Sequence, residues 1–226
     1  MVKILDNKHI FWQAFLLASI VFWIGLLLGI SFEKSRINEI EGFYFDSETD
    51  LFDFELSTEL VYGSNSSCDI LYGESVVFAE KIFKEASKLE KYDDSNKITK
   101  ELISLHRRYD LLRILLWQDI AKINQQCENK VNIVVYLYQY IDPSLTTKAT
   151  QGAMSNSLIE LKQKYKNQII LIPIAVDTNV ASLDFLRKKY GLEIIPTIFV
   201  NDEHEFNSLE EISNIESILY NSSDLE

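Results

Sequence analysis

Residues 132–138 read NIVVYLY, and residues 169–176 read IILIPIAV. β-branched and aromatic side chains dominate both runs, which is the composition of strands buried in a sheet. A third run, IIPTIFV at 194–200, precedes turn residues at 201–203 and a short strand that ends at Phe206. These runs predict a sheet in the last hundred residues of the chain.

Helix signals lie between and after these strands. Asp142-Pro143 supplies an N-cap followed by proline at the first helical position, and it opens a helix to about Tyr165. A second helix runs over 181–190 and stops at Gly191. Residues 208–211, Ser-Leu-Glu-Glu, form a capping box that starts a last helix. The order β-α-β-α-β-β-α predicts one compact α/β domain over residues 129–221.

This element order, with Ile195-Pro196-Thr197 at the mouth of the third strand, resembles the thioredoxin-like fold. In that family the proline at this position is cis and packs beside the N-terminus of the first helix, where the redox Cys-x-x-Cys lies. The resemblance covers about residues 129–220 and implies a cis bond before Pro196. With the segments that precede this domain, the whole chain is also similar to membrane-anchored archaeal thioredoxin-like proteins.

The redox motif of the family is missing. Residues 139–148 contain no cysteine, and Leu145–Lys148 stands where the motif would be. A dithiol mechanism needs a low-pKa thiolate at a helix N-terminus and a second sulfur to resolve the mixed disulfide. Thr146 or Thr147 offers a hydroxyl, but no histidine is near in sequence to activate it. We therefore predict no catalytic residue and no cofactor.

The resemblance also implies a peptide-binding groove. In the family, the residue before the cis-proline pairs its backbone with an extended ligand, and that residue would be Ile195 here. The groove would consist of Tyr138, Tyr140, Ile141, Leu145, Thr146, Thr147, Lys148, Ile195 and Pro196. Strand alternation offers an ordinary alternative for the tyrosines, with one set in the core and the other amphipathic.

Residues 68–128 predict a helical hairpin. Turn and cap formers at 92–96 separate two segments with helical periodicity. The apolar stripe of the first segment is Leu71, Phe78, Ile82, Ala86 and Leu89, and that of the second is Ile98, Leu102, Leu105, Tyr109, Leu112, Leu116, Ile120 and Ile123. The charged run His106–Asp110 is expected to form a solvated face of the second helix.

Cys68 precedes the first helix of this hairpin, and Cys127 follows the second. In an antiparallel pair both cysteines lie at the same open end, which makes a disulfide between them possible. It would close a 60-residue loop and stabilise the fold by roughly 3–4 kcal/mol on the loop-entropy model. The alternative is two unrelated reduced cysteines, as expected if the body of the protein faced the cytosol.

Residues 10–32 form an uncharged apolar run of 23 residues. At about 1.5 Å per residue, a helix of this length spans the hydrocarbon core of a bilayer. A cleavable signal peptide would have a shorter run and a small-x-small cleavage site, and a buried core helix is the other alternative. We predict an uncleaved transmembrane helix that follows a short tail, residues 1–9.

The orientation of the predicted transmembrane helix is inferred from the charged residues on its two sides. Lys3 and Lys8 precede the apolar run, and Lys34 and Arg36 follow it, so the count beside the membrane is balanced. Residues 37–226 hold 18 basic and 32 acidic side chains. An N-terminus in the cytoplasm and a body outside the cell membrane is the expected arrangement.

The juxtamembrane segment, residues 33–67, is acidic. Asp46, Glu48 and Asp50 resemble the start of a calcium loop, but Leu51 replaces the required glycine and Ser57 the required bidentate glutamate. We expect instead a solvated acidic face beside Phe52, Leu56 and Leu60, which recur at helical spacing.

Composition excludes several classes of protein. The formal charge is −12, whereas binding to a phosphate backbone requires clustered Lys and Arg, so nucleic acid is not an expected partner. Two cysteines and three dispersed histidines do not match zinc-ligand spacing, and we expect no metal site. The leading hypothesis is a non-catalytic, membrane-anchored domain that binds a protein or peptide partner or supports a membrane complex. The alternative is a thiol-disulfide oxidoreductase, or its accessory, that uses Cys68 and Cys127.

Overall fold

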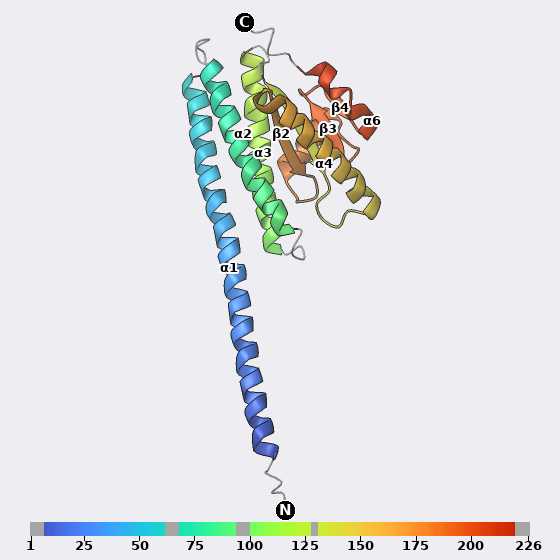
Figure 1. Cartoon of the computed structure of the whole chain (residues 1–226). Helices are drawn as coiled ribbons and strands as arrows, with labels where there is room; N and C mark the ends of the chain where they lie inside the picture. The colour runs from blue at the N-terminus through green and yellow to red at the C-terminus, as the bar shows by residue number, and fades with distance from the viewer. Residues whose placement is uncertain (1–6, 62–67, 94–99, 128–130, 220–226) are drawn as a thin grey trace, which may run out of the picture. The chain divides into compact units, whose positions relative to one another are not determined.

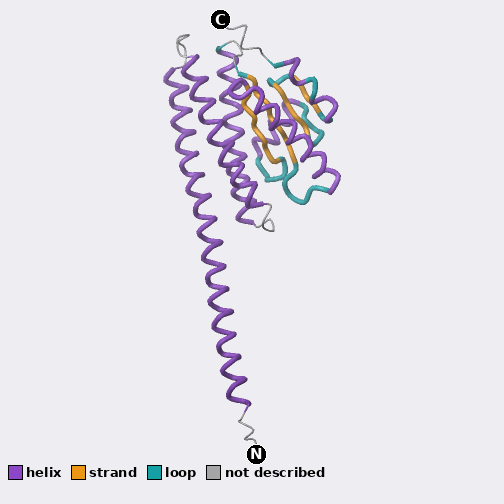
Figure 2. Tube along the Cα trace, viewed as in Figure 1, coloured by secondary structure: helices purple, strands orange, loops and turns teal. Residues whose placement is uncertain are grey.

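The computed structural model describes residues 7–61, 68–93, 100–127 and 131–219. These residues form a mixed α/β protein with six α-helices and a four-stranded sheet (Figures 1 and 2). The chain divides into two compact units, Met1–Phe43 and Tyr44–Glu226. Helix α1 (Asn7–Val61) contributes to both units.

In the first unit, α1 contains the predicted apolar segment. Ile10–Phe32 is long and apolar enough to cross a membrane, and its large apolar side chains are exposed. The helical form of this segment is therefore confirmed, and its insertion into a membrane stays a prediction.

In the second unit, the remainder of α1 packs through residues that the sequence analysis did not select. Leu51 and Phe54 are buried, and Phe54 stacks on Phe78 with ring centroids 5.9 Å apart. The expected stripe is wrong, because Phe52 and Leu56 are exposed on α1. The side chain of Leu60 lies outside the described residues.

Helices α2 (Cys68–Asp93) and α3 (Lys100–Gln126) pack against one another, which confirms the two predicted helices. The described members of both predicted stripes are buried: Leu71, Phe78 and Ile82 on α2, and Leu102, Leu105, Tyr109, Leu112, Leu116, Ile120 and Ile123 on α3. Ile98 and the side chains of Ala86 and Leu89 lie outside the described residues.

The sheet contains β1 (Asn132–Tyr138), β2 (Ile169–Ala175), β3 (Thr197–Val200) and β4 (His204–Phe206). Its order is β2-β1-β3-β4. Strands β1 and β2 are parallel, while β3 runs antiparallel to both β1 and β4. The connecting helices are α4 (Leu145–Tyr165), the 3-10 helix η2 (Lys166–Gln168) and α5 (Ala181–Tyr190), and the chain continues through α6 (Leu209–Ile212) and η3 (Ile215–Ile218).

Helices cover both faces of this sheet. Successive side chains of a strand point to opposite faces. Val134 and Tyr136 pack in one cluster with Met154 and Leu158 of α4. On the other face, α3 packs against β1 and β2, and Trp117 of α3 meets the Phe199 ring edge-on. Helix α3 therefore packs on both α2 and the sheet, and α2 also contacts β2.

This position of α3 overturns the expectation for His106–Asp110. His106 and Asp110 are buried, Arg108 is half-buried and Arg107 is exposed. The apolar stripe forms one buried side of α3, whereas His106 and Asp110 belong to a second buried side. A helix that is packed on two sides has no continuous solvated face at these positions.

Two element boundaries also differ from prediction. Helix α4 begins at Leu145 with Ser144 as its N-cap, because Asp142 has a positive φ of 47° and does not cap it. Strand β3 begins at Thr197, so residues 194–196 lie before the sheet. The predicted helix at 181–190 is confirmed, and Gly191 ends it in the left-handed conformation with φ 73°.

Candidate functional site

The candidate site is at the edge of the sheet where the parallel strands β1 and β2 end. Tyr138, the last residue of β1, is aligned with Ala175, the last residue of β2. Loops 139–144 and 176–180 consequently leave the sheet side by side. The carboxyl ends of parallel strands are where α/β proteins commonly place ligands, because both loops project from that edge.

Hydrogen bonds fix the first of these loops. The Asp177 carboxylate accepts from the backbone N–H of Tyr140 at 3.0 Å and from that of Ile141 at 2.7 Å. Gln151 of α4 bonds reciprocally with the backbone of Gln139, at 3.1 and 2.9 Å. The loop is thus tied to the β2–α5 loop and to α4.

The N-terminus of α4 follows this loop. The Ser144 hydroxyl accepts from the backbone N–H of Thr147 at 3.1 Å, as expected for an N-cap. The Leu145 side chain is 89% exposed, and Thr146 and Lys148 are also exposed. This helix start presents an apolar group, a hydroxyl and a cation to solvent, and no thiol.

The segment before β3 has a cis Ile195–Pro196 peptide bond. Pro196 is buried, Ile195 is half-buried and the Ile194 side chain is 58% exposed. Because Thr197 is aligned with Leu137, Ile195 lies beyond the paired residues, beside the end of β1. Within the described part of the chain, neither Ile194 nor Ile195 forms a hydrogen bond.

A buried polar cluster on α3 lies beneath the loops. Asp110 accepts from the Thr178 hydroxyl at 2.9 Å, from the Ala175 backbone N–H at 3.2 Å and from Arg113 at 3.3 Å. Burial raises the pKa of Asp110 above its usual range, although Arg113 and these hydrogen bonds oppose the rise. The His106 ring stacks on the Tyr140 ring.

The sequence analysis missed this cluster. Asp110 lies one residue after the buried Tyr109, and His106 one residue after Leu105. A second row at positions 106, 110, 113 and 117 has helical spacing, but three of its four members are polar. Hydrophobic periodicity does not detect such a row, because the method counts apolar residues.

The predicted groove residues do not all lie on one side of the sheet edge. Tyr138 stacks on Tyr136 and packs with the cluster beneath α4, whereas Tyr140 stacks on His106 of α3. Ile141 is half-buried in the loop that Asp177 holds. Leu145, Thr146, Thr147 and Lys148 form the start of α4, and Ile195 and Pro196 precede β3.

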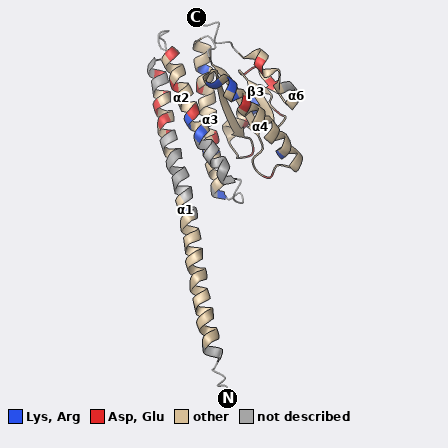
Figure 3. Ribbon diagram, in the orientation of Figure 1, with Lys and Arg blue, Asp and Glu red and all other residues tan. Residues whose placement is uncertain are grey.

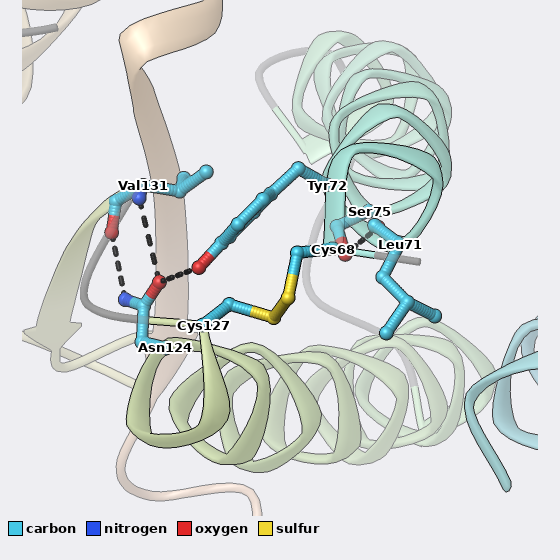
Figure 4. Close-up of a disulfide and its surroundings, with 7 residues drawn as sticks. All are labelled: Cys68, Leu71, Tyr72, Ser75, Asn124, Cys127 and Val131. Carbon is cyan, nitrogen blue, oxygen red and sulfur yellow. Dashed lines mark hydrogen bonds between the residues drawn. A yellow bond between two sulfur atoms is a disulfide. The ribbon is translucent and has the colours of Figure 1, made fainter. Parts of the chain in front are cut away.

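The two cysteines lie near Val131, directly before the start of β1, whereas the candidate site is at the edge where β1 ends (Figure 4). Their sulfur atoms are 1.92 Å apart, at disulfide distance, and their Cα atoms are 5.8 Å apart. Cys68 and Cys127 are 8% and 4% exposed. Nearby, Asn124 links Tyr72 to the backbone of Val131, with bonds of 3.2 Å from the Tyr72 hydroxyl and 2.7 Å to the Val131 carbonyl. The pair thus joins both helices of the hairpin near the start of β1.

No protein-family model matches this chain, and no curated protein sequence matches it. Across the described residues, no group of three or more His, Cys, Asp or Glu side chains is arranged to hold a metal ion. The chemistry of the site therefore has to be inferred from its own geometry.

Proposed function

We propose that this chain is a single-pass membrane protein whose thioredoxin-like domain binds an extended peptide or protein segment without redox chemistry. The backbone of Ile194 and Ile195 carries the proposal. These residues are partly exposed and form no hydrogen bond within the described residues, so their N–H and C=O groups are available to an extended ligand. Main-chain pairing of this kind is a common basis of peptide recognition.

Three features support the thioredoxin-like assignment. The elements follow the order β-α-β-α-β-β-α from Asn132 onward. The bond before Pro196 is cis, as the resemblance implies. Pro196 directly precedes the residue aligned with Leu137, so it lies at the same end of β1 as the loop to α4. The start of α4 carries Leu145–Lys148 where the family carries its thiols.

The alternative function is thiol-disulfide exchange by Cys68 and Cys127. Exchange requires an accessible sulfur that a thiolate can attack, and both cysteines are buried between helices. A structural bridge would have a reduction potential below about −300 mV, and a cycling bridge would lie well above this value. We favour a structural role for the pair.

The anchored topology is also part of the proposal. Ile10–Phe32 would cross the cell membrane with residues 1–9 in the cytoplasm. The second unit would then lie outside the cytoplasm, which suits a disulfide.

Site-specific photo-crosslinking in cells tests the binding function. A photoreactive amino acid would replace Leu145 or Ile194 in the full chain. The control position is Ile159, which is exposed on α4 about 21 Å along the helix from Leu145. We expect the same protein adduct from positions 145 and 194 and none from position 159.

An adduct from all three positions, or from none, would contradict a groove at the β1 edge. Insulin reduction by the purified chain that is lost in Cys68→Ser would instead support the oxidoreductase.

A further inference from the structure

The described part of α1 in the second unit has two apolar sides. Leu51 and Phe54 face the core. At 100° per residue, Phe45, Thr49, Phe52 and Leu56 lie on the opposite side of the same helix. Phe45, Phe52 and Leu56 are 58%, 62% and 54% exposed, and Thr49 is exposed as well. We call these four residues the outer stripe.

The outer stripe has the spacing of a coiled-coil seam. Its members follow at intervals of four, three and four residues. In the seven-residue repeat of a coiled coil, labelled a to g, Thr49 and Leu56 would occupy position a, and Phe45 and Phe52 would occupy position d. Two exposed phenylalanines and a leucine in one row are unusual for a surface that stays in water, because clustered apolar exposure marks an interaction site.

Acidic residues lie on the part of α1 that carries the stripe (Figure 3). Glu48 and Glu55 occupy g positions along one side, and Asp53 occupies an e position on the other. Glu48 and Asp53 form no ion pair within the described residues, whereas the neighbouring Asp50 pairs with Lys81. Burial raises the pKa of Glu55 and the Asp119 carboxylate raises it further, although the nearby Lys122 cation of α3 opposes the rise.

The acidic residues beside the outer stripe disfavour its pairing with the same stripe of a second copy. In a parallel pair of copies, Glu48 would face Asp53 of the other copy, because g residues meet e residues of the partner helix. In an antiparallel pair, Glu48 and Glu55 would face the same residues of the other copy. Both arrangements place carboxylates against carboxylates, which disfavours self-association. An anionic membrane surface is disfavoured for the same reason.

We propose that the outer stripe binds an amphipathic helix of a partner protein whose apolar seam is flanked by Lys and Arg. Phe45, Phe52 and Leu56 supply the apolar contact. Glu48, Asp53 and Glu55 select for the basic flanks. This surface is on α1, and its occupation does not depend on the groove at the edge of the sheet.

The test measures the binding of two synthetic helical peptides to the full chain, which is reconstituted in zwitterionic nanodiscs. Both have leucine at a and d positions, and they carry either lysine or glutamate at e and g. We expect the lysine peptide to bind and to protect Phe45 and Phe52 from hydroxyl-radical oxidation. The double variant Phe52→Ser/Leu56→Ser should weaken its binding at least tenfold.

Charge reversal provides the second variant. Glu48→Lys/Asp53→Lys should weaken binding of the lysine peptide and improve binding of the glutamate peptide. The matched control is Phe185→Ser/Asp184→Lys on α5, where a similarly exposed phenylalanine lies beside an exposed acid. This control should bind the lysine peptide like the wild type.

Three results would overturn the proposal. One is equal binding of the lysine peptide by the wild type and both stripe variants. Another is protection of Phe45 and Phe52 in nanodiscs before any peptide is added, which would mean that lipid covers them. The third is a wild-type dimer that Phe52→Ser/Leu56→Ser dissociates, which would assign the stripe to a second copy.

Discussion

The His106 ring lies against the Tyr140 ring, with centroids 3.8 Å apart and an interplanar angle of 28°. His106 belongs to α3 of the hairpin, and Tyr140 belongs to the loop that leads to α4. The hairpin therefore forms part of the support of the candidate site. Asp110 extends this support, since it bonds to residues at the end of β2.

Asp177→Ala should loosen the loop at 139–144. The substitution removes the acceptor of the Tyr140 and Ile141 backbone N–H groups. We expect the substitution to lower the local stability of the loop by about 2 kcal/mol, so amide exchange at these two residues should accelerate roughly 30-fold. Hydrogen exchange measured by mass spectrometry checks this. Asp184→Ala, at an exposed position in the first turn of α5, is the control and should leave exchange of the loop unchanged.

Asp110→Ala should destabilise the second unit by about 2–4 kcal/mol. It would leave the Ala175 N–H and the buried Arg113 guanidinium without their acceptor, and the Thr178 hydroxyl with only a longer bond of 3.4 Å to the Ala175 carbonyl. Urea unfolding in detergent, followed by tryptophan fluorescence, measures the loss. Thr178→Val removes one of these bonds and should cost about 1 kcal/mol. Equal stability of Asp110→Ala and wild type would show that the cluster does not hold α3 to the sheet.

Asp110→Asn should reveal the raised pKa of the Asp110 carboxyl. Burial raises that pKa in the folded state, so the folded protein keeps this proton at pH values where the unfolded chain has lost it. The contribution of this group to stability is thus complete at low pH and is lost as pH rises through the folded pKa. The free energy of unfolding of the wild type, minus that of Asp110→Asn, should decrease from pH 4 upward. A difference that grows with pH would mean that Arg113 outweighs burial.

Replacing both cysteines by serine should lower the free energy of unfolding by roughly 3–4 kcal/mol, because the bridge spans 59 residues of sequence. Denaturation of Cys68→Ser/Cys127→Ser beside the wild type measures the difference, and reduction of the wild type should produce a comparable loss. Non-reducing peptide mapping should recover Cys68 and Cys127 in one cross-linked pair. Reaction of both cysteines with a maleimide in the unreduced, denatured protein would contradict the bridge.

Protease added to right-side-out vesicles should digest residues 37–226 and spare the N-terminus. The expectation rests on the apolar helix Ile10–Phe32 and the acidic body that follows it. An epitope tag at each end of the chain, detected by immunoblot, reports which end the protease has digested. Complete protection of the C-terminal tag, with loss on detergent treatment, would reverse the orientation and favour reduced cysteines.

The strands were predicted from continuous β-branched and aromatic runs, which suit a sheet with both faces covered. The hairpin was predicted from one apolar stripe on each of its helices. Helical periodicity failed where a helix packs on two sides. The apolar row of α3 was visible, but the row with His106 and Asp110 is polar and pairs with groups that are distant in sequence, such as Thr178. On α1, Phe52 and Leu56 were as apolar as Leu51 and Phe54, and composition alone could not decide which pair faces the core.

The packing of α3 on one face of the sheet has a consequence for dissection of the protein. If the chain were cut before Val131, the face of the sheet that holds Ile133, Val135 and Leu137 would lose the helix that covers it. An uncovered β-sheet face of this composition invites aggregation. Leu51 and Phe54 of α1 are buried as well, with Phe54 stacked on Phe78 of α2. Fragments intended for crystallisation or binding assays should therefore keep the whole second unit from Tyr44 onward, so that the solubility of the α/β part is preserved.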